Sequence, residues 1–522
     1  MPTLRSVGVP VKARKIYRNP TVDDLRILAG KQPNVRQTCY GNLNTTTEVL
    51  ARSNASTFFV TDQPDDFSGQ CLTVEKGAEI CRLQDEYLLD REVIIIDGYI
   101  GDDPEFRTRA RLVIDSENAN VAAMQQVLYY PLDPVDSDTF EPELTIIYTG
   151  GLKAAGYPDE RVIAVFLEQG VTRVLGTDYF GESKKSGLRM WNQRVFERGG
   201  LPLHAGCKII PVQGTQKVGL IVGLSGTGKT TTTFTEQNNS MPVQDDFVAW
   251  MPNGRVYATE NGCFAKTYGL NEESEPVITR AVKESTAWIE NVSQNAQGDL
   301  DFFDDSYTQN GRAVVRMADI EGAAAANQIQ RPDFLLILNR SQNVIPAVAR
   351  LSLEQAAAYF MLGETMGTSA GGAAEAGKSL RIPGTNPFFP LRHDLQGNRL
   401  LELMNQNPIE IYLMNTGWVG GGGEHGEGVK VKIRHSSAIV KGIAEGTIEW
   451  EQDPDFDFQV ATHVPGIGEE DAFLLRPRLM YESQQRTDEY LRHLARLKRE
   501  RREYLAKFPL LRPEIVSAAV EV

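Results

Sequence analysis

A glycine-rich segment supplies the residue types that hold a nucleoside triphosphate. It reads Gly-Leu-Ser-Gly-Thr-Gly-Lys-Thr over residues 223–230 and follows the apolar run Val218–Val222, which predicts a buried strand. Glycines let backbone N–H groups curl around phosphate oxygens, the Lys229 ammonium reaches the β- and γ-phosphates, and the Thr230 hydroxyl can bind Mg²⁺. The preceding strand favours a phosphate-binding loop over a chance glycine-rich turn.

Two adjacent aspartates follow shortly after this loop. They stand in Val-Gln-Asp-Asp-Phe at residues 243–247, behind a short apolar approach. This is the expected arrangement when a second strand presents carboxylates to the metal beside a triphosphate. Because an Asp-Asp pair alone is common in surface turns, the prediction that one of them binds metal depends on the phosphate loop.

The elements that must position these groups are strands of an α/β protein. A turn at Gly199–Pro202 separates two halves, and we expect one domain over residues 1–200 and a second over residues 201–522. Apolar runs predict strands in both halves. These runs are 93–96, 144–148, 161–167, 334–338 and 410–414.

Composition indicates an ordinary globular protein. The chain has 522 residues, of which 41% are hydrophobic and 24% charged, so it exceeds what a single hydrophobic core usually supports. Its formal net charge of −15 argues against nucleic acid or an anionic membrane as a general partner.

The chain shows no targeting or redox signature. Residues 1–17 lack an apolar core of signal-peptide length, and no later segment reaches 18 uninterrupted apolar residues, so we expect a cytoplasmic protein. Its five cysteines form no Cys-x-x-Cys pair, which indicates reduced, structural thiols rather than disulfides or a zinc site.

Three later stretches have distinct compositions. Residues 367–377 are rich in Ser, Gly and Ala, and residues 417–428 contain four consecutive glycines. Each predicts a loop, either a lid that closes over a nucleotide or a plain surface connection. Residues 481–507 are rich in Arg, Glu, Leu and Lys and predict a solvated helix.

A second set of motifs resembles ATP-dependent phosphoenolpyruvate carboxykinases. Tyr-Phe-Gly-Glu-Ser-Lys-Lys at 179–185, then His204, the phosphate loop and the aspartate pair stand in the order and spacing of that family. Other matching segments extend the resemblance from about residue 50 to about residue 430. They are Asp97–Gly101, Glu260–Thr267, Asn310–Arg312, Val344–Leu351 and Asn415–Trp418.

The resemblance implies a metal and nucleotide site. Lys185, His204 and Asp246 match the family's Mn²⁺ ligands, a set in which the lysine amine is neutral. Lys229 matches the phosphate-binding lysine and Thr230 the hydroxyl that binds Mg²⁺. The expected nucleotide-binding residues are Gly223, Ser225, Gly226, Thr227, Gly228, Lys229, Thr230, Thr231, Glu260, Arg312, Lys430 and Ser436.

The resemblance also implies residues around an organic acid. Arg52 occupies the place of the arginine that holds the substrate carboxylate, and Tyr179 that of the tyrosine near the carbon dioxide position. Arg312 matches the arginine that bridges the transferred phosphoryl group and the acid, a role suited to a fixed guanidinium fork. Together with Lys185 and Lys229, these are the expected catalytic residues.

The implied fold is that of a two-domain carboxykinase, with a mixed α/β N-terminal domain and a C-terminal phosphate-loop domain. The implied reaction decarboxylates oxaloacetate to the pyruvate enolate and then phosphorylates the enolate oxygen with ATP, a gluconeogenic step. The implied partners are oxaloacetate or a related acid, ATP, Mn²⁺ and Mg²⁺, bound by a monomer or small homo-oligomer.

The acid-binding segment departs from the family pattern. The family's Gly-Arg-Ser-Pro-Lys-Asp-Lys is replaced by Ala-Arg-Ser-Asn-Ala-Ser-Thr at residues 51–57, which removes two lysines and an aspartate. Phe180, Phe247, Lys430 and the lid region at 367–389 differ as well. These changes leave the metal and triphosphate residues intact but remodel the walls around the acid and the adenine.

Two other functions remain as alternatives. One is a kinase of the same fold with a different small-molecule or protein acceptor, whose hydroxyl would need a general base. The nearest candidate bases are Glu182, Glu260 and Asp245. The other is a non-catalytic, nucleotide-binding regulatory protein, which would have no use for Lys185, His204 and Arg312.

Overall fold

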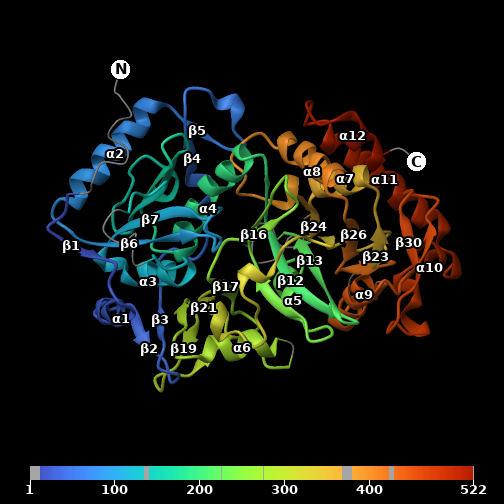
Figure 1. Cartoon of the computed structure of the whole chain (residues 1–522), viewed down its shortest axis with the longest axis horizontal. Coiled ribbons are helices and arrows are strands. Elements are labelled where there is room, and N and C mark those ends of the chain that lie inside the picture. Colours follow the sequence, from blue (N-terminus) through green and yellow to red (C-terminus); the bar gives the residue numbers. More distant parts are fainter. Residues whose placement is uncertain are drawn as a thin grey trace. The chain divides into compact units, whose positions relative to one another are not determined.

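The chain forms two compact units in a computed structural model that describes residues 12–133, 140–224, 226–273, 275–366, 379–421 and 428–520. The first unit comprises Met1–Glu197, Thr259–Glu321 and Phe388–Arg392. The second comprises Arg198–Ala258, Gly322–Pro387 and His393–Val522. Figure 1 shows the elements of each unit along the chain.

A single boundary near residue 200 does not describe these units, because the chain returns to the first one after residue 258. The physical reason is a five-stranded sheet that joins the two regions of sequence. Its order is β17 (Gly262–Lys266), β21 (Arg312–Arg316), β18 (Trp288–Glu290), β3 (Leu43–Thr45) and β2 (Val35–Gln37). The parallel pairing of β18 with β3 ties the later segment to the N-terminal one.

An eight-stranded mixed sheet forms the core of the first unit. Its order is β1 (Lys15–Arg18), β6 (Glu92–Ile100), β7 (Thr108–Asp115), β8 (Leu144–Thr149), β10 (Val171–Leu175), β9 (Val162–Phe166), β4 (Thr57–Val60) and β5 (Cys71–Leu72). The strands predicted at 93–96, 144–148 and 161–167 are confirmed as β6, β8 and β9.

Five helices accompany these sheets in the described part of the first unit. They are α1 (Val22–Ala29), α2 (Val74–Leu88), α3 (Ala119–Leu128), α4 (Phe180–Glu197) and α6 (Pro276–Lys283), with a short ribbon of β19 (Ser293–Gln294) and β20 (Leu300–Asp301). Helix α4 packs on β7, β8, β9 and β10, so that even its lysines Lys184 and Lys185 are buried. This helix therefore presents charged side chains inside the fold.

A second eight-stranded sheet forms the core of the second unit. Its order is β14 (Met241–Gln244), β12 (Ala205–Val212), β13 (Thr215–Val222), β22 (Phe334–Asn339), β26 (Glu410–Asn415), β23 (Val348–Arg350), β30 (Gln459–His463) and β29 (Glu449–Gln452). The strands predicted at 218–222, 334–338 and 410–414 are confirmed as β13, β22 and β26.

The strand directions in this sheet gather several chain segments at one edge. β13 is parallel to β22, and β22 is parallel to β26. β12 is antiparallel to both β13 and β14, so β14 runs in the direction of β13. The C-terminal ends of β14, β13, β22 and β26 and the N-terminal end of β12 therefore lie at the same edge, where α/β sheets commonly bind ligands.

The remaining described elements of the second unit surround this sheet. The strands are β11 (Leu201–Leu203), β15 (Val248–Trp250), β16 (Val256–Ala258), β24 (Glu364–Met366), β25 (Ser379–Arg381), β27 (Trp418–Val419) and β28 (Val429–Lys430). The helices are α5 (Lys229–Phe234), α7 (Leu353–Leu362), α8 (Asp394–Gln406), α9 (Ile433–Glu445), α10 (Pro477–Ser483), α11 (Thr487–Leu505) and α12 (Pro513–Val520).

The charged C-terminal stretch forms α11, which is less solvated than its composition predicts. Tyr490, Leu494 and Leu505 are buried, and α11 packs with α7, α10 and α12 (Figure 1). The fully buried Arg501 pairs with Glu364 at 2.7 Å. This buried ion pair connects α11 to β24, so the helix contacts the second unit through a charged residue as well as through apolar ones.

The two low-complexity stretches fall largely beyond the described residues. Residues 367–377 lie wholly outside them, and residues 422–427 of the second stretch do as well. On either side of the latter gap, Trp418 of β27 pairs with Lys430 of β28.

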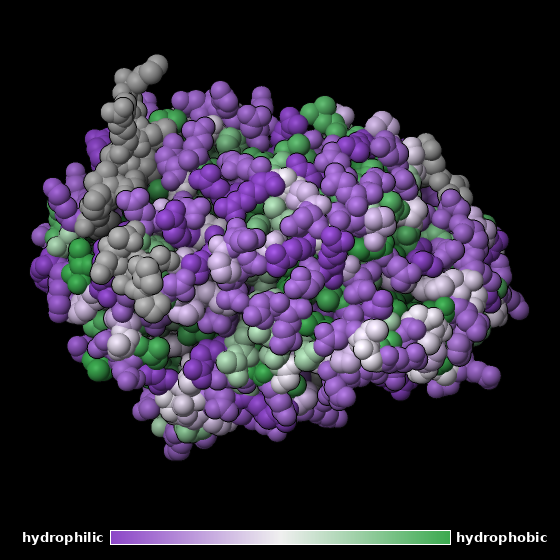
Figure 2. All heavy atoms as spheres, in the orientation of Figure 1, coloured by the Kyte–Doolittle hydropathy of each residue, from purple (hydrophilic) through white to green (hydrophobic). Residues whose placement is uncertain are grey.

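Hydrophilic side chains cover most of the face shown in Figure 2, and the hydrophobic ones on it are scattered. Among the described helices, none is long and apolar enough to cross a membrane. All five cysteines are free thiols, and Cys207 and Cys263 are buried, as expected of structural thiols.

The close packing of α5 on β12 gives a prediction about stability. A Cβ added at Gly206 would overlap the Thr233 hydroxyl, which donates to the carbonyl of Lys229. We expect Gly206→Ala to lower the free energy of unfolding by about 1–3 kcal/mol, measured by urea denaturation. The double variant Gly206→Ala/Thr233→Ala should recover part of this loss. A single variant as stable as the wild type would contradict the packing.

Candidate active site

The edge of the second unit's large sheet collects residues from five separate segments. His204 directly precedes β12, and the first residue of β12 pairs with Val222 at the end of β13, where the phosphate loop begins. Asp245 directly follows β14, while Arg340 and Thr416 follow β22 and β26. Strand pairing alone therefore brings the loop, a histidine and the aspartate pair together.

Two side chains of this edge meet at one carboxylate oxygen of Asp246. His204 Nε2 lies 3.0 Å from Asp246 Oδ1, and Lys229 Nζ lies 3.4 Å from the same oxygen. Beside them, the Thr230 hydroxyl donates to Asp245 Oδ2 at 3.2 Å. All five side chains are buried or partly buried, which strengthens their mutual electrostatic interactions.

The donors at this point suit a divalent cation. His204 Nδ1 lies 3.1 Å from the carbonyl oxygen of Thr385, while Nε2 faces the Asp246 carboxylate. A neutral imidazole carries only one N–H, so it can donate to only one of these two oxygens. The other oxygen can be satisfied by protonation of the ring or by a cation between the ring and the oxygen. An Nδ1–H donated to a carbonyl fixes the ring and leaves Nε2 to bind a metal, as in many metal sites. Among the described residues, no group of three or more His, Cys, Asp or Glu side chains is arranged to hold a metal ion.

The phosphate loop has the backbone that its glycines predict. Gly226 and Gly228 have φ angles of +83° and +91°, which favour glycine because a Cβ would clash in this region. Arg340 Nη1 donates to the carbonyl of Gly226 at 2.9 Å, and the Thr416 hydroxyl donates to that of Thr227 at 2.7 Å. The loop is therefore anchored by side chains that directly follow β22 and β26, and Lys229 begins α5. Ser225, a predicted loop residue, lies outside the described residues.

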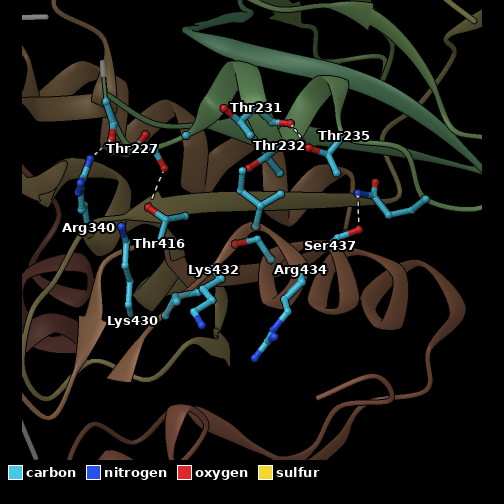
Figure 3. Close-up of a pocket in the computed structure, with 16 residues that line it drawn as sticks. Thr227, Thr231, Thr232, Thr235, Arg340, Thr416, Lys430, Lys432, Arg434 and Ser437 are labelled. Atoms are coloured by element: carbon cyan, nitrogen blue, oxygen red, sulfur yellow. Dashed lines mark hydrogen bonds between the residues drawn. The ribbon is translucent and has the colours of Figure 1, made fainter. Parts of the chain in front are cut away.

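A cavity of about 580 Å³ lies beside the loop within the second unit. Figure 3 shows Thr231, Thr232 and Thr235 on one side and the residues around Lys430 and Lys432 on the other. This volume lies within the range of small-molecule sites, about 300–1,000 Å³. The predicted nucleotide residues Thr231, Lys430 and Ser436 all line it, whereas Glu260 and Arg312 belong to the first unit.

The cavity is also lined by positively charged side chains that were not among the predicted nucleotide-binding residues. Arg340, Lys432 and Arg434 line it together with Lys430. Arg434 pairs with Asp471 at 2.6 Å. The sequence signal for Lys432 and Arg434 was the Lys-Val-Lys-Ile-Arg run at residues 430–434, a short basic stretch that leads into α9.

A buried lysine supports the helix that follows the loop. Lys208 on β12 donates to the carbonyls of Thr232 at 3.1 Å and Thr235 at 2.6 Å, and to Gln237 Oε1 at 2.7 Å. Burial lowers the pKa of Lys208 to about 7, and Glu236 opposes this shift. Because carbonyls at a helix C-terminus attract a cation, the Lys208 side chain caps the C-terminal end of α5. The sequence signal was a lysine inside an otherwise apolar strand.

In the first unit, Asn310 links two predicted residues to the segment that precedes Arg52. Its Oδ1 accepts hydrogen bonds from Arg312 Nε at 3.1 Å and Nη2 at 2.8 Å. Its Nδ2 donates to the Tyr179 hydroxyl at 3.3 Å and to the carbonyl of Leu50, two residues before Arg52, at 2.6 Å. The guanidinium of Arg312 is thereby oriented before any ligand binds.

Two aromatic rings support the cations of this unit. The ring of Phe264 lies 5.1 Å from Arg312 Cζ and 5.5 Å from Lys184 Nζ. The ring of Phe388 lies 4.8 Å from Arg52 Cζ and 4.5 Å from Lys185 Nζ. These distances fall within the range of cation–π attraction. The predicted residues Arg52 and Lys185 thus contact the same ring. No sequence motif pointed to Phe388.

The segment that carries Phe388 is fixed to the first unit. The amide of Ser68 donates to the carbonyl of Pro390 at 2.9 Å, and its hydroxyl donates to that of Phe389 at 2.6 Å. The ring of Phe389 also packs edge-on against Phe196 of α4. A five-residue segment that is distant in sequence therefore contributes a defined wall to this group of cations.

Two acidic residues that were candidate bases are engaged with cations. Glu260 Oε2 lies 2.9 Å from Lys184 Nζ, and both side chains are buried. Glu182 lies 3.8 Å from Arg189. A carboxylate paired with a cation is stabilised in its charged form and is a weaker base.

Comparison with known proteins identifies the family. The family model described as phosphoenolpyruvate carboxykinase matches residues 14–470. The chain belongs to the phosphoenolpyruvate carboxykinase family. The mixed α/β fold and the family predicted from the motifs are thereby confirmed.

Several phosphoenolpyruvate carboxykinases (ATP) match most of the chain. The protein from Brevibacillus brevis is 31% identical over 503 residues, which cover 92% of this chain and 93% of that protein. The one from Thermus thermophilus is 31% identical over 430 residues, 80% of this chain and 79% of that protein. The one from Caldanaerobacter subterraneus is 27% identical over 511 residues, 95% of each. The phosphoenolpyruvate carboxykinase resemblance therefore extends over both units.

The buried carboxyl of Glu290, beside Arg312, gives a prediction about how stability depends on pH. Glu290 ends β18 opposite Arg312, and its Oε1 accepts the Phe180 N–H at 3.0 Å. Burial raises its pKa to about 8. The folded state thus holds a proton that the unfolded state releases near pH 4.5. Stability should therefore fall as the pH rises from about 4.5 to 8, by up to about 1.4 kcal/mol per pH unit.

Glu290→Gln removes this titration and keeps the oxygen that accepts the Phe180 N–H. We expect its denaturation midpoint to vary less between pH 5 and 9 and to exceed that of the wild type near pH 8.5. Glu79→Gln, at an exposed position, is the matched control. Parallel pH profiles for the wild type and Glu290→Gln would rule out the titration of Glu290.

Proposed function

We propose that this chain catalyses the ATP-dependent decarboxylation and phosphorylation of oxaloacetate, giving phosphoenolpyruvate, ADP and carbon dioxide. The family membership supports the reaction, and one geometric observation carries it. Lys229 of the phosphate loop and His204 meet at the same oxygen of Asp246, within 3.4 Å and 3.0 Å. This contact supports the proposal, because phosphoryl transfer requires a nucleotide-binding cation and metal ligands at one point.

The second unit is proposed to hold ATP. The amides of residues 223–230 and the Lys229 ammonium would bind the triphosphate, and the adjoining cavity would take the nucleoside. Thr231, Lys430 and Ser436 line that cavity and are the proposed contacts. The anchoring of the loop by Arg340 and Thr416 keeps its amides in place, so less order has to be gained on binding.

His204 and Asp246 are proposed to hold a divalent metal, Mn²⁺ by the family resemblance, and the resemblance assigns Lys185 a ligand role as well. Thr230 is the proposed ligand of Mg²⁺ on the triphosphate. When bound, these metals supply charge stabilisation at the enolate and phosphoryl oxygens. The Thr385 carbonyl fixes the His204 ring so that Nε2 faces the metal position.

The first unit is proposed to hold the organic acid. Arg52 would bind a carboxylate, Arg312 would bridge the acid and the transferred phosphoryl group, and Tyr179 would lie near the departing carbon dioxide. Because Asn310 already orients Arg312 and contacts Tyr179, these groups need little rearrangement when the acid binds. No general base is needed, since the enolate oxygen produced by decarboxylation is itself the nucleophile.

A kinase with a hydroxyl acceptor is less well supported. Such an acceptor requires a base, yet Glu260 pairs with Lys184, and Asp245 accepts a hydrogen bond from Thr230. A regulatory protein that only binds nucleotide is also less well supported, because the contact of His204 with Asp246 serves no purpose in binding alone.

Turnover tests the proposal directly. Purified protein with Mn²⁺, Mg²⁺, ATP and oxaloacetate should form phosphoenolpyruvate. Lys229→Ala should reduce kcat/KM by about 10²-fold or more, because the charge on the transferred phosphate loses its ammonium partner. Lys217→Ala, whose side chain is 41% exposed on β13, is the matched control. ATP binding without phosphoenolpyruvate would show that the acceptor is another compound.

Metal binding tests the ligand assignment separately. His204→Ala should weaken Mn²⁺ binding by about 10–100-fold, measured by electron paramagnetic resonance titration. His463→Ala, at an exposed position, should leave it unchanged. The same titration tests the ligand role proposed for Lys185, since Lys185→Ala should then also weaken Mn²⁺ binding. If His204→Ala binds Mn²⁺ as tightly as the wild type, the ligands lie elsewhere.

A further inference from the structure

Helix α4 carries a buried charged face that the proposed function uses only in part. Glu182, Lys185 and Arg189 follow one another at spacings of three and four residues, which places them on one face of the helix. The Arg189 side chain is only 4% exposed. Lys185 has a proposed role as a metal ligand, but the motifs that match the family give Arg189 none. A buried arginine without a role calls for an explanation.

Arg189 belongs to the group of cations around Phe388. Its Cζ lies 5.8 Å from the centroid of that ring, which also contacts Arg52 and Lys185. Burial lowers the pKa of Arg189, Glu182 opposes this shift, and the positive charge of Arg52 adds to it. Cations this close repel one another unless an anion lies among them.

Among the described residues, Glu182 is the carboxylate beside Arg189, and it is only loosely paired with it. Glu182 Oε2 lies 3.8 Å from Arg189 Nη1, beyond hydrogen-bond distance, and the other oxygen of Glu182 accepts a long bond of 3.4 Å from the Ser53 amide. Nη1 is buried and has no hydrogen-bond partner among the described residues. Within the residues that the structure describes, Arg52 has a cation–π contact with Phe388 and no ion pair. A buried donor without an acceptor is costly, so this arrangement favours an incoming anion.

The sequence shows why an added cation is needed here. The segment 51–57 keeps Arg52 but lacks the two lysines of the family pattern. Ser53, the next residue, donates to Glu182 on the helix face that carries Arg189. The altered segment and Arg189 thus border the same group of side chains.

We propose that Arg189 is an anion-binding residue that holds a carboxylate of the organic acid together with Arg52 and supplies positive charge in place of the two absent lysines. The ligand class is a small dicarboxylate. Its identity as oxaloacetate rests on the proposed function. Arg189 thereby sets specificity for the acid and has no part in binding ATP.

Steady-state kinetics distinguish these roles. Arg189→Gln should raise KM for oxaloacetate by about 10–100-fold, the loss expected for a charge-assisted hydrogen bond, and change KM for ATP by less than about 2-fold. Arg189→Lys keeps the charge and should recover part of the effect. Arg194→Gln, on the same helix and 34% exposed, is the matched control. An equal rise of both KM values would overturn the proposal.

A double variant separates acid binding from a purely structural ion pair. Arg189→Gln leaves Glu182 buried without a cation, whereas Glu182→Gln/Arg189→Gln removes both charges. If Arg189 binds the acid, KM for oxaloacetate stays raised in the double variant, even where its thermal denaturation midpoint returns to the wild-type value. If Arg189 only neutralises Glu182, KM returns as well, and the proposal fails.

A binding measurement keeps this inference distinct from the proposed function. Oxalate, a small dicarboxylate, is titrated calorimetrically into the wild type, Arg189→Gln and Arg194→Gln. Binding that weakens about 10-fold or more only in Arg189→Gln supports the anion site, even if the wild type forms no phosphoenolpyruvate. Oxalate that binds none of the three proteins, or binds all of them equally, overturns it.

Discussion

The direction of the strands in the second unit's sheet determines where its chemistry can take place. Four strands end at one edge and β12 begins there, so residues from positions 204 to 416 gather without any long-range loop. Hydrogen-bonded register fixes each strand to within one residue, and a slip by one residue would turn every side chain to the other face. The contact of His204 with Asp246 is therefore a consequence of how β12 pairs with β13 and β14.

The first unit addresses a different problem, which is how to keep several cations close together away from water. Aromatic rings are the means, since Phe264 and Phe388 offer negative faces to Lys184, Arg312, Arg52 and Lys185. Lys184 is also neutralised by its ion pair with Glu260. A ring, by contrast, attracts a cation without neutralising it, so the charge of Arg52 beside Phe388 remains available to an anionic substrate.

The sequence predicts those parts of the molecule whose causes are local. Apolar runs such as 334–338 became strands because buried parallel strands need continuous apolar side chains, and the glycines of residues 223–228 predicted the loop through their backbone freedom. The return of residues 259–321 to the first unit left no such signal. It depends on strands as short as β18, whose partner β3 lies more than 240 residues earlier. The roles of Phe388 and Arg189 were hidden for the same reason, since each depends on neighbours that are distant in sequence.

The chain crosses between the two units five times, and this affects how the protein can be made in a cell. The first unit cannot complete its five-stranded sheet until β21 has left the ribosome, although its first 197 residues emerge much earlier. At about 5–20 residues per second, the interval from Glu197 to Glu321 lasts roughly 6–25 s. During that time the strand β3 has no partner in β18 and exposes an unpaired edge. The nascent chain is therefore expected to depend on chaperones, and a fragment ending near residue 200 to aggregate rather than fold.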